Sequence, residues 1–476
     1  MVAENREPFP SAALTVAGEA PAARGFPFPG VAPRHGCGGA WGRQGADPAG
    51  PAPPTQRKQG CAGNAGYTRG SMSSVASGPD ARAARATVTF LYTSGFVQGV
   101  IMVSFAASSA VLRGRHGFSD TQYGSIFLPQ VALSAVGAIG SSALLRRLDL
   151  RRLLVLSFAS MALSQAALAA SHFLEPGPAF AAVLLGTSLM GLGAGLSAAP
   201  LNTYPQLLFP ARSDSAVVAM HTAIGFGLAG GPLFVGAVVG YGAWLLFPLV
   251  FLAACLYLLG ETLRVALPEG PPPRTPKERG PSPAGAPRFW LFVALAVLYA
   301  VAEAAYANWA VLYLSEEKGL PVASASLGLA AFWLALSAGR VLAGFFVLRF
   351  PGERVYLGLP VLMAAASLLL PRADGVASGV TLYALAGLGC SAFYPLTVSL
   401  ASRRFPGHVA WVGAILYAAL VTGIGLGSFA AGALRERWPL STIYGWSALC
   451  PLLALVLALP AIARPEKAPG PEAAGP

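Results

Sequence analysis

The apolar and polar residues of this chain are arranged in long blocks. From residue 86 onward, apolar runs of about 20 residues, the length that crosses a bilayer core, alternate with short polar or basic segments. Alternation with a period of two is absent, so the runs predict helices and not the strands of an outer-membrane barrel. The twelve predicted spans are 86–112, 121–145, 153–172, 179–209, 216–240, 242–264, 289–314, 322–348, 354–371, 379–401, 409–434 and 441–463.

Composition supports an all-α, multi-pass membrane protein. Of the residues, 55% are hydrophobic and only 11% are charged, and the mean hydropathy is +0.59. Soluble domains carry roughly 25% charged residues. The net charge of +12 is then explained by topology and by anionic lipid of the bilayer, and no nucleic-acid partner is expected.

The segments outside the spans define the expected domains. Of residues 1–80, 25 are Gly or Pro, which predicts a disordered tail or a mis-called start, with Met72 as an alternative first residue. A Pro-rich basic linker at 266–288 separates two six-helix bundles, 81–265 and 289–464. Residues 465–476 are predicted to form a second disordered tail.

The distribution of basic residues predicts the orientation. With the N-terminus inside, 18 Lys and Arg residues after residue 81 fall in cytoplasmic segments and 6 fall on the opposite side. Basic flanks are retained on the cytoplasmic side. We therefore expect a plasma (inner) membrane protein with both termini in the cytoplasm, and we expect a monomer.

The two bundles share an internal repeat. A shift of 196 residues superposes Gly191 on Gly387 and Phe209-Pro210 on Phe405-Pro406, among further glycines. A shift of 204 relates the second span to the eighth. Two homologous six-helix halves that enclose a site near the bilayer midplane are typical of the major facilitator class.

Four stretches resemble a known family. They are "LNTYPQLLFPARSDSAVVAMHTAIGFGLAGGPLFVG" (201–236), "AEAAYANWAVLYL" (302–314), "FWLALSAGRVLAG" (332–344) and "YPLTVSLASRRFP" (394–406). Together they are similar to the fucose-permease-like branch of the major facilitator superfamily. The resemblance implies transport by alternating access, with the two halves rocking about a central site.

The sequence also departs from the superfamily pattern. In "GSSALLRRLDLRR" (140–152), Leu144 stands where the superfamily usually has an acid, which puts its gating salt bridge in doubt. The stretch "GLAGGPLFVG" (227–236) resembles an antiporter signature, although close helix packing explains small residues at that spacing equally well.

One acid lies in the middle of the seventh span. At 100° per residue, Tyr299, Glu303, Tyr306 and Tyr313 share a stripe roughly 80° wide, which suits a lumen better than lipid tails. An acid at this depth is costly and is read as functional. Glu303 is therefore the candidate for proton coupling, and the three tyrosines are candidates for substrate binding; a structural, hydrogen-bonded acid is the alternative.

Three further polar residues are candidates for a gate or an ion pair. Arg340, the only Lys or Arg in the interior of a predicted span, fits three roles: pairing with Glu303, extending toward the cytoplasmic face, or holding an anionic substrate. Asn202 and His221 lie at matching depth on the hairpin of the fourth and fifth spans, so a hydrogen bond between them is expected. It would serve as a polar clamp or as a pH-responsive gate.

Amides and aromatic rings suggest the class of solute. Gln98, Gln130, Trp333 and Tyr394 are candidates for binding sugar faces and hydroxyls, although such residues also pack and anchor helices. Asn308 lies about 180° from the Tyr299 stripe and is expected to pack against another helix.

The sequence holds no enzyme or metal-site motif, so no cofactor, no metal and no enzymatic activity are expected. The predicted function is transport of a small, neutral, sugar-like solute by proton symport through Glu303. The alternative is export of drugs or metabolites by proton antiport.

Overall fold

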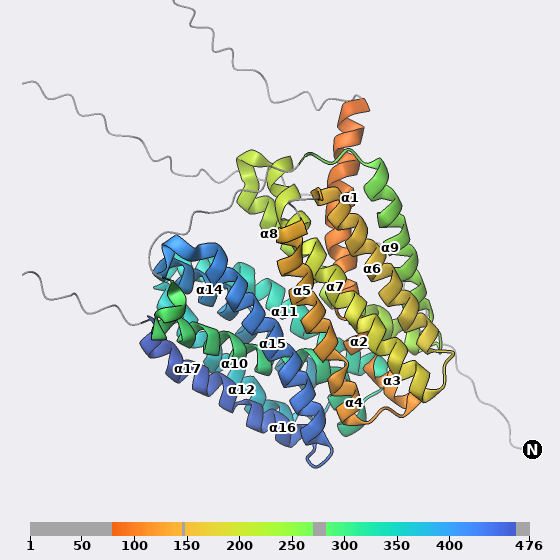
Figure 1. Ribbon diagram of the computed structural model, residues 1–476. Helices are drawn as coiled ribbons and strands as arrows, with labels where there is room; N and C mark the ends of the chain where they lie inside the picture. Colours follow the sequence, from red (N-terminus) through yellow and green to blue (C-terminus); the bar gives the residue numbers. More distant parts are fainter. Residues whose placement is uncertain (1–78, 145–147, 270–281, 463–476) are drawn as a thin grey trace, which may run out of the picture. The chain divides into compact units, whose positions relative to one another are not determined.

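The computed structural model describes residues 79–144, 148–269 and 282–462. Met72, residues 1–78, the linker segment 270–281 and the predicted C-terminal tail lie outside these ranges. Every regular element within them is a helix (Figure 1).

The first set of helices, the N-half, ends before the linker. Its helices are α1 (Pro79–Met102), α2 (Ser104–Ala107), α3 (Ser109–His116), α4 (Asp120–Ser125), α5 (Phe127–Leu144), α6 (Leu150–Ser171), α7 (Pro176–Leu208), α8 (Ser213–Val239) and α9 (Leu246–Arg264). The second set, the C-half, comprises α10 (Pro287–Leu312), α11 (Val322–Arg349), α12 (Gly352–Leu369), α13 (Val376–Cys390), α14 (Phe393–Arg404), α15 (Val409–Arg435), α16 (Leu440–Ser447) and α17 (Leu449–Ile462).

These elements confirm the predicted helical fold. Within the described ranges, eleven helical stretches are long and apolar enough to cross a membrane. The first predicted span corresponds to α1, α2 and α3, which are interrupted at Val103 and Ser108. The ninth predicted span, 354–371, is the continuous helix α12, which runs through Pro360. Below, the inner side is the side predicted to be cytoplasmic, and the outer side is the opposite one.

Glycines related by the repeat make matching helix contacts. A Cβ atom on Gly191 of α7 would clash with the carbonyl oxygen of Gln130 in α5. A Cβ atom on Gly387, its counterpart in α13, would clash with the carbonyl oxygen of Phe332 in α11. Backbones can approach this closely only where small residues face each other. The same residue type therefore sets the same kind of helix approach in each half.

Candidate functional site

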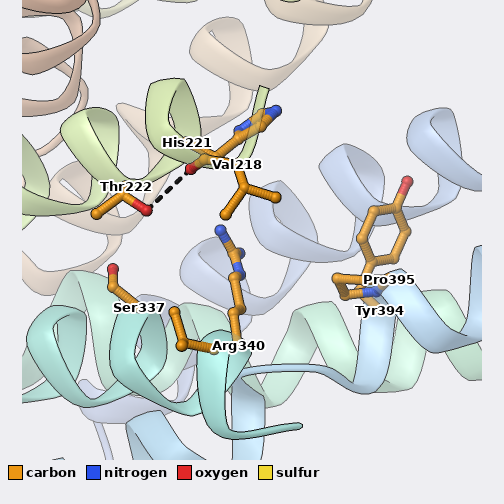
Figure 2. A pocket seen from close by; sticks show the side chains of 8 residues that line it. Val218, His221, Thr222, Ser337, Arg340, Tyr394 and Pro395 are labelled. Atoms are coloured by element: carbon orange, nitrogen blue, oxygen red, sulfur yellow. Dashed lines mark hydrogen bonds between the residues drawn. The ribbon is translucent and has the colours of Figure 1, made fainter. Parts of the chain in front are cut away.

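A cavity lies between the N-half helix α8 and the C-half helices α11 and α14 (Figure 2). Its volume of about 430 Å³ lies within the usual range for small-molecule sites. The residues that line it are Val218, His221, Thr222, Ser337, Arg340, Val341, Tyr394 and Pro395. Three of the residues singled out in the sequence, His221, Arg340 and Tyr394, are thus brought together.

The cavity lies on the inner side of the contact between the halves. Helix α8 begins on the inner side, and the lining residues Val218 to Thr222 precede Gly225 along it. Helix α11 runs the opposite way, and Arg340 and Val341 follow Ser337 along it. Gly225 and Ser337 are in close contact: a Cβ atom added to Gly225 would clash with the Ser337 hydroxyl.

Arg340 is held at a break in a neighbouring helix. Helix α13 ends at Cys390 and α14 begins at Phe393, and the Ser391 carbonyl in this break accepts a hydrogen bond of 3.2 Å from Arg340 Nε. In Figure 2 the guanidinium extends from α11 toward α8. Among the described residues no acidic group forms a salt bridge with Arg340. A direct ion pair with Glu303, one of the three roles considered above, is therefore not formed in this state.

Glu303 lies in α10 and its residue is 8% exposed. Its carboxyl group lies near Tyr299 of the same helix and within the electrostatic influence of Arg340. Tyr299 donates its hydroxyl proton to the Cys390 carbonyl at 3.1 Å and stacks on Tyr394, with ring centroids 6.2 Å apart. The acid is thus linked to the cavity lining through one tyrosine and one arginine.

The other two tyrosines of the predicted stripe point elsewhere. Tyr306 and Tyr313 are both fully buried and donate hydrogen bonds to the carbonyls of Met363 and Leu370, at 2.9 Å and 2.7 Å. The expectation that this whole face lines a lumen is therefore wrong for Tyr306 and Tyr313. Tyr299 does not line the cavity either, but it stacks on Tyr394, which does. Farther along, the stripe faces the neighbouring helix of its own half.

The predicted hydrogen bond between Asn202 and His221 is confirmed. His221 Nε2 and Asn202 Oδ1 are 3.1 Å apart, and Asn202 Nδ2 donates to the Ala198 carbonyl at 2.7 Å. Asn308 packs against another helix as expected, since its Nδ2 donates to Ser428 Oγ of α15 at 2.7 Å.

The remaining candidates do not line this cavity. Gln98 is 7% exposed and its Nε2 lies 4.0 Å from Met102 Sδ. The side-chain oxygens of Gln98 and Gln130 and the Trp333 indole nitrogen are buried and have no hydrogen-bond partner within the described part of the chain. These three residues are not brought together with Arg340.

A charge network on the outer side was not anticipated. It joins Arg113 and Asp120 of the N-half to Glu316 and Arg435 of the C-half, with Arg113 paired to Asp120. Arg113 Nε lies 3.3 Å from Glu316 Oε1, and Arg435 Nη2 lies 2.6 Å from Glu316 Oε2. Arg435 Nη1 lies 3.1 Å from Asp120 Oδ1 but makes no hydrogen bond with any described residue, so that contact is an electrostatic one. Thr121 and Glu436 add a hydrogen bond between the halves.

Close packing surrounds this network. A Cβ atom on Gly124 of α4 would meet the Ser428 carbonyl oxygen, and one on Gly432 of α15 would meet that of Asp120. Helices α4, α5 and α15 pack against one another here (Figure 1). Tyr123 carries one further hydrogen bond between the halves here, of 2.7 Å to the Asn308 carbonyl. Tyr417 and Ser134, nearer the middle of their helices, share another of 2.8 Å. The outer side is therefore closed.

Comparison with known proteins agrees with this fold. The model of the Major Facilitator Superfamily matches residues 87–370 and 291–476. The fosmidomycin resistance protein of Escherichia coli (strain K12) is 25% identical over 288 residues, which are 58% of this chain and 70% of that protein.

Two solved structures are similar over most of the chain. A mutant of the nucleoside transporter NupG has a TM-score of 0.67 and 14% identity, and the match covers 79% of this chain and 100% of that one. A bacterial homologue of the human lysosomal transporter Spinster, in an inward-facing and occupied conformation, has a TM-score of 0.60 and 15% identity, covering 79% and 94%. At these identities the likeness shows the fold alone.

Proposed function

The chain belongs to the Major Facilitator Superfamily and is a membrane transporter of that type, and we propose that it moves a small organic solute by alternating access with Glu303 as its proton-coupling group. Its place in the fucose-permease-like branch, its inner-membrane location with both termini cytoplasmic, and a monomeric state stay predictions from the sequence.

The observation that carries the proposal is the contrast between the two sides of the interface. The outer ends of the halves are joined by charges and close glycine contacts, whereas a cavity lies between α8, α11 and α14 on the inner side. A site accessible from one side only is what alternating access requires of each end state. We assign this structure to the inward-facing state.

Glu303 is suited to coupling by its position. It is buried in a membrane helix, where an ionisable group is costly and commonly marks a proton pathway. Gain or loss of its proton changes the charge beside Arg340, which lines the cavity. Protonation is thus felt where the solute binds.

Uptake into proteoliposomes tests this role. The solute is taken from a thermal-shift screen of sugars, nucleosides, organic anions and fosmidomycin, because a bound ligand stabilises the folded protein. The wild type should accumulate it in response to an imposed pH gradient, and Glu303→Gln should only equilibrate it. Glu353→Gln, at an exposed acid of α12, is the matched control and should behave as the wild type. Uptake by Glu303→Gln that still follows the pH gradient would remove Glu303 from the mechanism.

Export is the second candidate function, and it is favoured by the similarity to the fosmidomycin resistance protein and by the glycine-rich stretch 227–236. Expression in cells that lack their own pump for this drug separates the two directions. A raised minimal inhibitory concentration of fosmidomycin, lost in Arg340→Gln, would support export. An unchanged or lowered concentration would count against it.

A further inference from the structure

The polar groups around the cavity differ in whether they already have partners. His221 and Thr222 on α8 are engaged, with Asn202 and with the Val218 carbonyl. The Arg340 guanidinium uses only its Nε, and the Ser337 hydroxyl is buried without a partner among the described residues. In the same described ranges, the Tyr394 hydroxyl has no hydrogen bond. Each of these unengaged groups can donate a hydrogen bond, and the guanidinium can only donate.

Among the described residues that line the cavity, one side chain is charged, and it is a cation. No carboxylate stands among the lining residues, and no described acid forms a salt bridge with Arg340. Ser337 and Arg340 are three residues apart on α11 and so lie on one face of that helix. In Figure 2 both side chains point toward α8. A guanidinium with a hydroxyl beside it presents several donors to a single anionic group.

The rest of the lining is apolar. Val218 and Val341 are 58% and 48% exposed, and Pro395 and the ring of Tyr394 complete the wall. A solute that binds only through hydroxyl groups would leave these surfaces unused and would not neutralise the charge of Arg340. An apolar body attached to an anionic group satisfies both parts of the cavity.

We infer that the cavity binds organic monoanions, whose charged group is held by Arg340 and Ser337 and whose apolar body lies against Val218, Val341 and Tyr394. This inference rests on the proposed function and names the class of its solute. It replaces the neutral, sugar-like solute expected from the sequence with a different substrate class.

The same arrangement links the anion to the proton. The titratable groups that face Glu303 are Tyr299 of its own helix, Arg340 of α11, Cys390 at the end of α13 and Tyr394 of α14. Arg340 is the only cation in this set. An ionised Glu303 offsets the charge of Arg340, whereas a protonated Glu303 leaves that charge to the bound anion. Proton and anion therefore bind cooperatively and cross together, with no net charge moved.

Binding of matched probes to the purified full chain tests the substrate class. The pairs are benzoate with benzamide, hexanoate with hexanamide, and benzenesulfonate with benzenesulfonamide. At least one anion should bind the wild type more tightly than its neutral partner, and Arg340→Gln should weaken that binding roughly thirtyfold or more. Arg340→Lys should recover part of the loss.

Arg349→Gln is the matched control, because Arg349 is exposed near the end of the same helix and does not line this cavity. It should bind the probes as the wild type does. Thermal unfolding of each variant without probe confirms that it is folded. Equal binding of both members of every pair, or equal loss in Arg340→Gln and Arg349→Gln, would overturn the inference.

Flux measurements separate failure of this inference from failure of the proposed function. The affinity for the preferred anion should rise as the pH falls, and this dependence should be absent in Glu303→Gln. If anions bind at Arg340 but no flux is measured in proteoliposomes, the transport function is refuted and the anion-binding site stands. If neutral probes are carried with protons and Arg340→Gln does not change their flux, the transport function stands and the inference of an anionic substrate is refuted.

Discussion

At the outer side of the interface, Arg113 and Arg435 face Asp120 and Glu316, so positive and negative charges cancel across the halves. At the inner side, Arg340 has one backbone hydrogen bond and no carboxylate partner among the described residues. The outer side chains are only 12–32% exposed, whereas Arg340 is exposed. The charged groups at the outer end of the interface are paired within the protein, whereas Arg340 at the inner end still has N–H groups that can bind a ligand.

This difference indicates that the outer side acts as a gate and that the inner cavity acts as a binding site. Charges that are neutralised by the opposite half hold the two halves together and must part when the outer side opens. A cation that is not neutralised by the protein is instead available to a ligand. Mutations on the outer side should therefore change the balance between states, whereas mutations around the cavity should change binding itself.

The largest change in the balance between the two states is expected from a bulky side chain at the outer contact. In Gly124→Leu the new side chain would meet the Ser428 carbonyl, and overpacking of this kind costs about 1–3 kcal/mol. The closed outer side should lose that stability, so the outward-open state should gain population. Labelling of a Ser337→Cys background from outside by a membrane-impermeant maleimide should become faster.

The control for this substitution is Gly140→Leu, because no atom of the described residues lies near the Cβ position at Gly140. It should leave the labelling rate unchanged. Equal rates in Gly124→Leu and Gly140→Leu would mean that the outer contact does not gate the cavity.

A smaller change is expected from the charge network. Arg435→Gln leaves Asp120 and Glu316 with Arg113 as their only cation in the network, and it removes a cation placed 5.9 Å from the ring of Trp309. Because these groups are partly exposed, the closed state should lose about 1 kcal/mol. The same maleimide labelling should accelerate severalfold.

A double-mutant cycle sharpens this test. Arg113→Gln and Glu316→Gln should each speed labelling, and the double variant should label more slowly than the two separate effects predict, because both substitutions break the same ion pair. Strictly additive effects of the two substitutions would show that this pair does not close the outer side.

The smallest change concerns a buried histidine near the outer end of the N-half. His116 is 6% exposed, its Nε2 has no partner within the described ranges, and burial, followed by the charges of Arg115 and His172, lowers its pKa from 6.5. The folded protein therefore resists a proton that the unfolded chain accepts below pH 6.5. Stability from this source is present above pH 6.5 and is lost as the pH falls below it.

The melting temperature should consequently fall between pH 7.5 and pH 5, with His116 contributing roughly 1–2 °C. In His116→Gln, which cannot be protonated, the fall should be shallower by that amount. An identical pH profile in the two proteins would show that His116 titrates equally in the folded and unfolded states.

Much of the fold follows from the sequence because hydrophobic periodicity and glycine spacing are local properties. Twelve apolar runs predicted the helices, and the 196-residue repeat predicted the paired positions of Gly191 and Gly387. The hydrogen bond of Asn202 with His221 was also predictable, since a short loop fixes the depth of both residues on one hairpin.

The site was less predictable because it depends on contacts between distant segments. Helical periodicity shows that Tyr299 and Tyr306 share a face, but it does not show that Tyr306 meets α12 while Tyr299 reaches the cavity side. The outer network joins residues more than 300 positions apart. Its one signal in the sequence was the pair of acids, Asp120 and Glu316, at span ends where basic residues alone had been counted.

Distances between spin labels on the two sides test the central claim most directly. Exposed positions Phe173 and Trp438 report on the outer side, and exposed positions Arg212 and Arg403 report on the inner side, in a variant without reactive cysteines. Introducing Gly124→Leu should lengthen the outer distance and shorten the inner one in the same molecules. If the two distances lengthen together, or if neither changes, the outer network and the inner cavity are not alternately open and the account is contradicted.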